Sequence, residues 1–166
     1  MSGKKLPAKT YPGFGLSMVE RSIREFFAER CTSQDLSRIR EYFANDGALH
    51  CAYCDAPSPD RWDHIHPVSR GGDTVPGNLV PACRRCDDSK QDKTLDEWAE
   101  SNGRYRPAEG QVPIIRRRIE GYQEHFQYVP QDFEDKLSPA QKEKYRRIRE
   151  QLESLRKVLK EEGITR

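Results

Sequence analysis

Apolar residues recur at helical spacing in two segments near the N-terminus. The first segment, residues 17–29, opens with a capping-box pattern at Ser17. The second starts near Ser33 and ends at the Asn-Asp-Gly turn that begins at Asn45. We predict a helix for each segment and expect both helices to pack as a scaffold on the rest of the fold. The preceding residues 1–15, rich in lysine, proline and glycine, are expected to form a flexible arm.

The middle of the chain has shorter apolar runs that are separated by turn residues. Residues 48–54 predict a short extended segment, residues 61–67 a strand, and residues 78–82 a returning strand. A helix is predicted at or just after Cys86, and a capping box at Thr94 predicts another, short helix. This part of the chain therefore predicts two strands followed by a helix.

Two further helices are predicted towards the C-terminus. One opens near Pro113, and the other opens at Ser138, where a capping box precedes a proline in the first turn. The second helix carries apolar residues at alternating spacings of three and four: Tyr145, Ile148, Leu152, Leu155 and Leu159. This heptad-like seam suits a coiled coil between two copies, and we expect a homodimer, although the seam suits packing within one chain equally well.

Composition adds limits on core size, charge and location. Hydrophobic and charged residues each make up 34% of the 166 residues, whereas a typical domain is about 25% charged. The apolar core must therefore be small. The formal net charge is only +2, so any affinity for nucleic acid must come from local basic clusters. No apolar run approaches ~20 residues and none resembles a secretion signal, so we expect a cytoplasmic protein with no membrane partner.

Four cysteines stand in two Cys-x-x-Cys pairs, Cys51 with Cys54 and Cys83 with Cys86. Four thiolates satisfy a tetrahedral zinc ion, and each pair presents two sulfur atoms to one ion. Disulfides or ordinary thiols are the alternatives, but a cytosolic chain rarely keeps disulfides. We therefore predict a structural zinc site. The remaining Cys31 is expected to be a small buried apolar residue.

Between and after these pairs lies a set of short motifs. They are Asp63-His64-Ile65-His66-Pro67, Gly71-Gly72, Asn78-Leu79, and Cys86-Asp87 with Lys90 three residues further on. As a set, these motifs resemble the HNH endonuclease family, whose fold is named ββα-metal. The resemblance covers roughly residues 48–100.

The resemblance implies an α+β fold with a ββα-metal core, zinc-bound cysteine knuckles and flanking N- and C-terminal helices. We expect an N-terminal arm with helices at residues 1–47, the nuclease core at residues 48–103, and a C-terminal helical region at residues 104–166.

The resemblance also implies the chemistry. His64 would be the general base, and Asp63 and Asp87 would hold a catalytic Mg²⁺, with Mn²⁺ as an alternative. Asn78 would brace the backbone of the loop that carries the base. The family usually has histidine or asparagine where this chain has Asp87, and Asp88 would replace it as ligand if the helix register shifted. Either carboxylate would also suit a helix N-terminus without any metal.

Basic residues near this core suggest contacts with a nucleic-acid backbone. The candidates for contact with DNA are His66, Arg70, Arg84, Arg85, Lys90, Arg116 and Arg117. A supporting role within the fold is the equal alternative for His66. Some of the arginines are expected only to solvate the surface.

The predicted function is metal-dependent cleavage of DNA, with 5′-phosphate and 3′-hydroxyl products as the family implies. A restriction or other defence enzyme is preferred, and a homing or phage-type nicking enzyme is the alternative within this class. A noncatalytic zinc module would need the cysteines and arginines but neither Asp63 nor His64. An RNA nuclease stays open, although the sequence predicts no aromatic platform for single strands.

Overall fold

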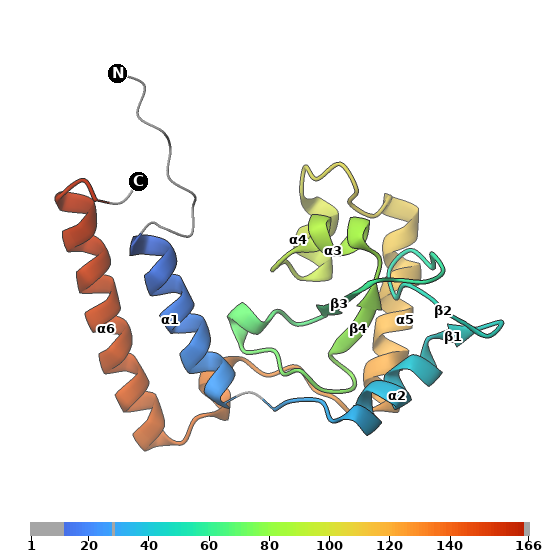
Figure 1. The fold of residues 1–166 in the computed structure, drawn as a ribbon, viewed down its shortest axis with the longest axis horizontal. Coiled ribbons are helices and arrows are strands. Elements are labelled where there is room, and N and C mark those ends of the chain that lie inside the picture. Colours follow the sequence, from blue (N-terminus) through green and yellow to red (C-terminus); the bar gives the residue numbers. More distant parts are fainter. Residues whose placement is uncertain (1–11, 28, 165–166) are drawn as a thin grey trace. The chain divides into compact units, whose positions relative to one another are not determined.

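The computed structural model describes residues 12–27 and 29–164, which form two compact units (Figure 1). The central unit contains residues 29–132. The terminal unit combines residues 12–27 with residues 133–164. Each unit is described by itself below.

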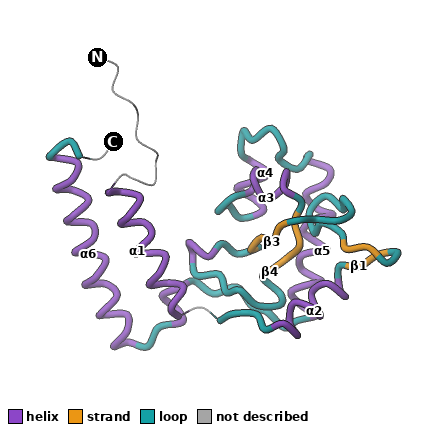
Figure 2. The backbone as a smooth tube through the Cα atoms, in the orientation of Figure 1, coloured by secondary structure: helices purple, strands orange, loops and turns teal. Residues whose placement is uncertain are grey.

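Helices occur in both units, whereas the two small sheets lie in the central unit (Figure 2). In chain order the elements are α1 (Pro12–Phe27), α2 (Ser33–Tyr42), β1 (Ala44–Asn45), β2 (Ala48–Leu49), β3 (Arg61–His64), β4 (Leu79–Ala82), α3 (Arg84–Lys90), α4 (Leu95–Glu100), α5 (Val112–His125) and α6 (Pro139–Glu161). This mixture confirms the predicted α+β class with flanking helices.

Local hydrogen bonds explain where helix α2 begins. Thr32 caps α2: its hydroxyl accepts from the Asp35 backbone N–H, and the Asp35 carboxylate accepts from the Thr32 N–H. Strands β1 and β2 then form a hairpin whose turn residues, Asp46 and Gly47, both have positive φ, at 49° and 77°. Such angles suit the tight turn of a hairpin with the usual right-handed twist.

The two longer strands, β3 and β4, pair in antiparallel register, with Asp63 opposite Val80 and His64 opposite Leu79. All four residues of β4 are buried. Pro81 lacks an N–H, and it sits in a two-stranded sheet where no further strand requires that donor. Helix α3 follows β4 after Cys83 and packs on β3 (Figure 1).

A single apolar cluster joins these strands to the helices around them. Ile39 from α2, Trp98 from α4 and Tyr122 from α5 are all almost completely buried in it. The Tyr122 hydroxyl donates a hydrogen bond of 2.7 Å to the Leu79 carbonyl oxygen in β4. Helix α5 therefore fixes the strand that faces His64.

The terminal unit is a pair of helices, α1 and α6, which run side by side (Figure 1). Phe133, Leu137 and Tyr145 form its small core, and Ile23 packs against them. Helix α6 has 23 residues. Neither α6 nor any other helix among the described residues is long and apolar enough to cross a membrane.

Several element boundaries differ from those predicted. Helix α1 begins at Pro12 rather than Ser17, and the Ser17 hydroxyl donates to the Gly13 carbonyl oxygen inside the helix instead of capping it. Strand β3 ends at His64, so His66 lies beyond the sheet. Helix α3 begins at Arg84, before rather than after Cys86.

The division into units also differs from the predicted three segments. The predicted boundaries after residues 47 and 103 both fall within the central unit, because α2 and α5 share its core. Residues 1–11 of the predicted arm lie outside the described residues, whereas residues 12–15 belong to α1.

The hydrogen bond between Tyr122 and Leu79 gives a test of the central core. Replacing Tyr122 with phenylalanine leaves a buried carbonyl oxygen without its donor and is expected to lower the free energy of unfolding by about 1–2 kcal/mol. Urea unfolding followed by tryptophan fluorescence measures this change, because Trp62 and Trp98 both lie in the central unit. Tyr42→Phe is the matched control, because the structure gives the Tyr42 hydroxyl no hydrogen bond to the described residues; an equal loss there would contradict the assignment.

Candidate active site

Four cysteine sulfur atoms lie together at one end of the paired strands. Cys51 and Cys54 come from the turn after β2, and Cys83 and Cys86 from the junction of β4 and α3. All four sulfur atoms lie within 4.8 Å of one another, and those of Cys54 and Cys83 are 3.6 Å apart. Sulfur ligands on tetrahedral zinc stand roughly 3.8 Å apart, so the cluster fits this ion. The thiols are free rather than joined as disulfides, which removes that alternative.

The thiols influence each other's acidity in opposite directions. A hydrogen bond with the Cys86 thiol lowers the pKa of Cys51 to about 5. The pKa of Cys86 is raised, first by the same hydrogen bond, and burial raises the pKa of Cys54 to about 11. One thiolate is therefore favoured while further ionisation is opposed. A divalent cation would remove that opposition, which is the chemistry expected of a four-thiolate site.

Asp63 is buried and its carboxylate is held from two sides. The Tyr53 hydroxyl donates to Asp63 Oδ2 over 2.6 Å, and Lys90 Nζ lies 2.9 Å from the same oxygen. Lys90 is fully buried, and its Nζ also donates to the His64 carbonyl oxygen over 2.7 Å. The last residue of α3 thus fixes both the carboxylate of Asp63 and the backbone of the neighbouring histidine.

His64 is half-buried at the end of β3, and its ring contacts a hydroxyl group. Nε2 lies 2.9 Å from Thr74 Oγ1. In the tautomer with hydrogen on Nε2, the ring donates to Thr74 and Nδ1 carries the basic lone pair. The Thr74 backbone N–H donates to the Glu29 carbonyl oxygen, so this hydroxyl sits on an anchored loop.

Asn78 makes three hydrogen bonds to the backbone of the loop that follows β3. Its Oδ1 accepts from the His66 N–H at 2.7 Å, and its Nδ2 donates to the carbonyl oxygens of His66 at 3.1 Å and Asp73 at 2.7 Å. Asn78 is fully buried. A Cβ atom at Gly72 would stand 1.9 Å from the His66 carbonyl oxygen, so this loop can close only around glycine.

The two aspartates after the last cysteine occupy different environments. Asp87 is half-buried, and its pKa is raised first by burial and then by the nearby carboxylate of Asp63. Asp88 is exposed and lies 3.4 Å from Arg84 Nε. This arrangement favours Asp87 over Asp88 as the partner of Asp63. Among the described residues, only the cysteines bring three or more possible ligand atoms within 4.8 Å of one another.

Two of the expected DNA contacts are turned into the protein. Lys90 is buried against Asp63, so we do not propose it as a phosphate contact. The His66 Nε2 atom is buried without a hydrogen-bond partner among the described residues, and Asp132 Oδ1 lies 3.8 Å from it. This burial supports the structural alternative for His66.

The arginine candidates lie on the surface of the central unit. Arg70 pairs with Glu97, Arg84 with Asp88, and Arg116 with Asp96, all between exposed side chains. The Arg85 guanidinium lies 5.6 Å from the centre of the Tyr105 ring, and Arg117 is exposed. Exposed ion pairs contribute only about 0–1 kcal/mol, so these arginines can exchange a carboxylate for another anion at little cost.

Sequence reasoning missed Tyr53 and Thr74 and misplaced Lys90. Lys90 follows the buried Cys86 by four residues, a spacing that puts both on one helix face, and this signal could have revealed its burial. Tyr53 and Thr74 reach the site from loops ten residues away from Asp63 and His64 respectively. No periodic sequence pattern predicts a contact between a strand residue and a residue in such a loop.

The comparisons with known proteins bear on this same segment. Residues 51–93 match a family model described as HNH endonuclease. The matched range contains all four clustered cysteines, both strands of the central sheet and the aspartates discussed above. Searches of curated proteins and of solved structures gave no match. The match to the HNH endonuclease family therefore covers the segment that holds the cysteine cluster and the paired strands.

Proposed function

We propose that this protein is a metal-dependent endonuclease that hydrolyses phosphodiester bonds in DNA. The observation that carries the proposal is the fixed pair of residues at the end of β3. Asp63 is held by Tyr53 and Lys90, and the neighbouring His64 has its ring bonded to Thr74. A general base beside a positioned carboxylate is what hydrolysis of a phosphate diester requires.

His64 would take the proton from the attacking water. An imidazole with an unperturbed pKa near 6.5 is largely neutral at pH 7 and can accept that proton. With the hydrogen on Nε2, the ring would donate to Thr74 Oγ1 and Nδ1 would act as the base. The bond from Lys90 to the His64 carbonyl oxygen would keep the backbone at this position fixed as the ring becomes charged.

Asp63 and Asp87 would hold the divalent cation, because carboxylate oxygens are hard ligands suited to Mg²⁺ or Mn²⁺. When bound, the cation would neutralise charge on the phosphate and stabilise the departing oxygen. Two carboxylates carry one more negative charge than the usual pairing of aspartate with asparagine. Lys90 shares Oδ2 of Asp63 and would offset that additional charge.

The four cysteines would hold a structural zinc ion, separate from the catalytic cation. They join the turn after β2 to the junction of β4 and α3, on either side of β3 in the sequence. A zinc ion there would keep Tyr53, which lies between Cys51 and Cys54, in place against Asp63. The exposed arginines of the central unit would supply contacts to the DNA backbone.

A restriction or other defence enzyme is the preferred biological role, and a homing or phage-type nicking enzyme is the alternative. A noncatalytic zinc module that binds nucleic acid would need the cysteine cluster and the arginines, but not the His64 ring that contacts Thr74 beside Asp63. An RNA nuclease would use the same residues, so the test below includes both nucleic acids.

Incubation with supercoiled plasmid and Mg²⁺ or Mn²⁺ tests the function. Nicked or linear DNA with 5′-phosphate ends is expected, and EDTA should abolish its formation. His64→Ala should reduce the rate about 10²–10⁴-fold without changing plasmid binding. His125→Ala, on α5, is the matched control and should keep the wild-type rate. Wild-type protein that cuts neither DNA nor a matched RNA would contradict the nuclease assignment, and unimpaired cutting by His64→Ala would remove His64 from the mechanism.

The contact between His64 and Thr74 generates a separate expectation. Thr74→Val keeps the shape of the side chain but removes the hydroxyl, and kcat should fall about tenfold because one hydrogen bond to the base is lost. KM should change little. Thr74→Ser restores the hydroxyl and should recover most of the rate. If valine and serine gave the same kcat, the hydroxyl would have no part in positioning the base.

Zinc binding can be measured independently of cleavage. Purified protein should retain one zinc ion per chain after dialysis, and a strong chelator should lower Tm sharply because metal binding supplies folding free energy. Cys86→Ser should reproduce that loss. Cys31→Ser changes a thiol outside the cluster and should retain zinc. Full retention of zinc and Tm by Cys86→Ser would show that the cluster is not the zinc site.

A further inference from the structure

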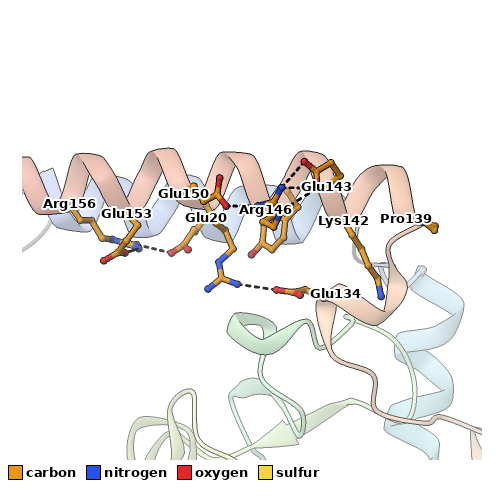
Figure 3. A pocket seen from close by; sticks show the side chains of 11 residues that line it. Glu20, Glu134, Pro139, Lys142, Glu143, Arg146, Glu150, Glu153 and Arg156 are labelled. Carbon is orange, nitrogen blue, oxygen red and sulfur yellow. Dashed lines mark hydrogen bonds and ion pairs between the residues drawn. The ribbon is translucent and has the colours of Figure 1, made fainter.

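One side of the terminal unit is polar, and its charges are paired within the unit. Figure 3 shows this side, a groove of about 740 Å³ along α6. Arg156 lies 2.7 Å from Glu20 of α1, and Arg149 lies 3.0 Å from Glu134. Arg146 pairs within α6. The arginines of this groove thus have acidic partners, and the pair of Glu20 with Arg156 marks which side of the two helices is polar.

A second side of α1 is apolar, and much of it is exposed. Each residue advances roughly 100° around a helix, so Val19 and Phe26 lie roughly 100–120° around from Glu20. Ile23 lies between Glu20 and these two residues on the helix surface. Ile23 faces the unit's core, whereas Val19 and Phe26 are 46% and 82% exposed. These residues and Met18 border an apolar hollow of about 480 Å³.

Helix α6 continues this apolar side. Ile148 and Leu155 lie roughly 80–100° around from Arg156, in the same sense as Val19 and Phe26 lie from Glu20 on the antiparallel helix. Both are exposed, at 38% and 45%. The two helices together therefore expose what we call the apolar flank, which consists of Met18, Val19, Phe26, Ile148, Leu155 and Val158.

We propose that a second copy of this chain covers the apolar flank, so that two terminal units form a four-helix bundle with twofold symmetry. In a twofold interface each chain presents the same patch, and an apolar patch is complementary to itself. The small core of the terminal unit, made of Phe133, Leu137 and Tyr145, leaves it in need of further burial.

Area and charge are both compatible with such a dimer. A helix pair with the 16-residue length of α1 is about 24 Å long and about 20 Å wide, which would bury roughly 500 Å² per chain and roughly 1,000 Å² in total. That total is near the lower limit for a specific interface, so a dimer with micromolar affinity is expected. At the edge of the flank, Arg21 and Glu25 pair at 2.6 Å within each chain, so these two charges are balanced locally.

This interface differs from the heptad-like seam that the sequence suggested for a dimer. Tyr145 is only 5% exposed because it packs against Phe133 inside the unit. Leu152 and Leu159, on the same stripe of α6, are half-buried. The seam thus serves the packing of one chain. The proposed interface uses its exposed edge together with α1.

Sedimentation equilibrium of the full chain tests the proposal without requiring cleavage activity, so it stands or falls separately from the nuclease assignment. Wild-type protein should be dimeric at tens of micromolar. Phe26→Glu with Leu155→Glu should give a monomer with an unchanged circular dichroism spectrum, because both side chains are exposed. Val158→Glu alone should weaken the dimer at least tenfold and serves as a second variant if the double variant folds poorly.

The matched control is Ile114→Glu, which places the same charge on a residue of α5 that is 60% exposed in the central unit. It should remain dimeric. A wild-type chain that is monomeric up to about 100 µM would overturn the proposal, whether its flank is covered by another protein or by another part of the same chain. A dimer that survives all three flank substitutions would overturn it equally.

Discussion

The arrangement of the central unit depends on one buried charge, the ammonium group of Lys90. An unpaired charge in a protein interior is strongly unfavourable, and breaking a buried ion pair by removing one partner costs about 3–5 kcal/mol. Lys90 is therefore tied to Asp63 and to the His64 carbonyl oxygen as long as α3 packs on β3. The same contact orders the fold and aligns the two residues proposed for chemistry, so stability and site geometry cannot vary independently here.

Around this contact the loops are fixed by hydrogen bonds rather than by regular structure. Asn78 satisfies both backbone groups of His66, and Gly72 allows the chain to close against it. Tyr53 reaches Asp63 from between two cysteines. A preformed site of this kind loses little conformational entropy when a substrate binds, which favours catalysis by positioning. The cysteine cluster and the Asn78 brace therefore support the same strand from opposite ends.

The sequence predicted the parts of this structure that rest on local pattern. Capping boxes at Thr94 and Ser138 gave helix starts that the structure confirms, and the cysteine spacing predicted the cluster. The exact residue at which a helix starts is harder to predict from one local pattern. Helix α1 starts at Pro12, upstream of the capping-box pattern at Ser17, because proline in the first turn also favours the start of a helix. The roles of Thr74 and Tyr53 could not be predicted, because they arise from contacts between loops whose course depends on the whole fold.

The terminal unit is built from both ends of the described chain, with the central unit lying between α1 and α6 in the sequence. The central unit is thus an insertion in a helical hairpin and is connected to it by two peptide segments instead of one. Two connections restrict the rotation of one unit against the other more than a single tether of the same length does. A cut in either connection leaves the two units joined through the other. Partial proteolysis of one connection would therefore not release the central unit from the terminal unit.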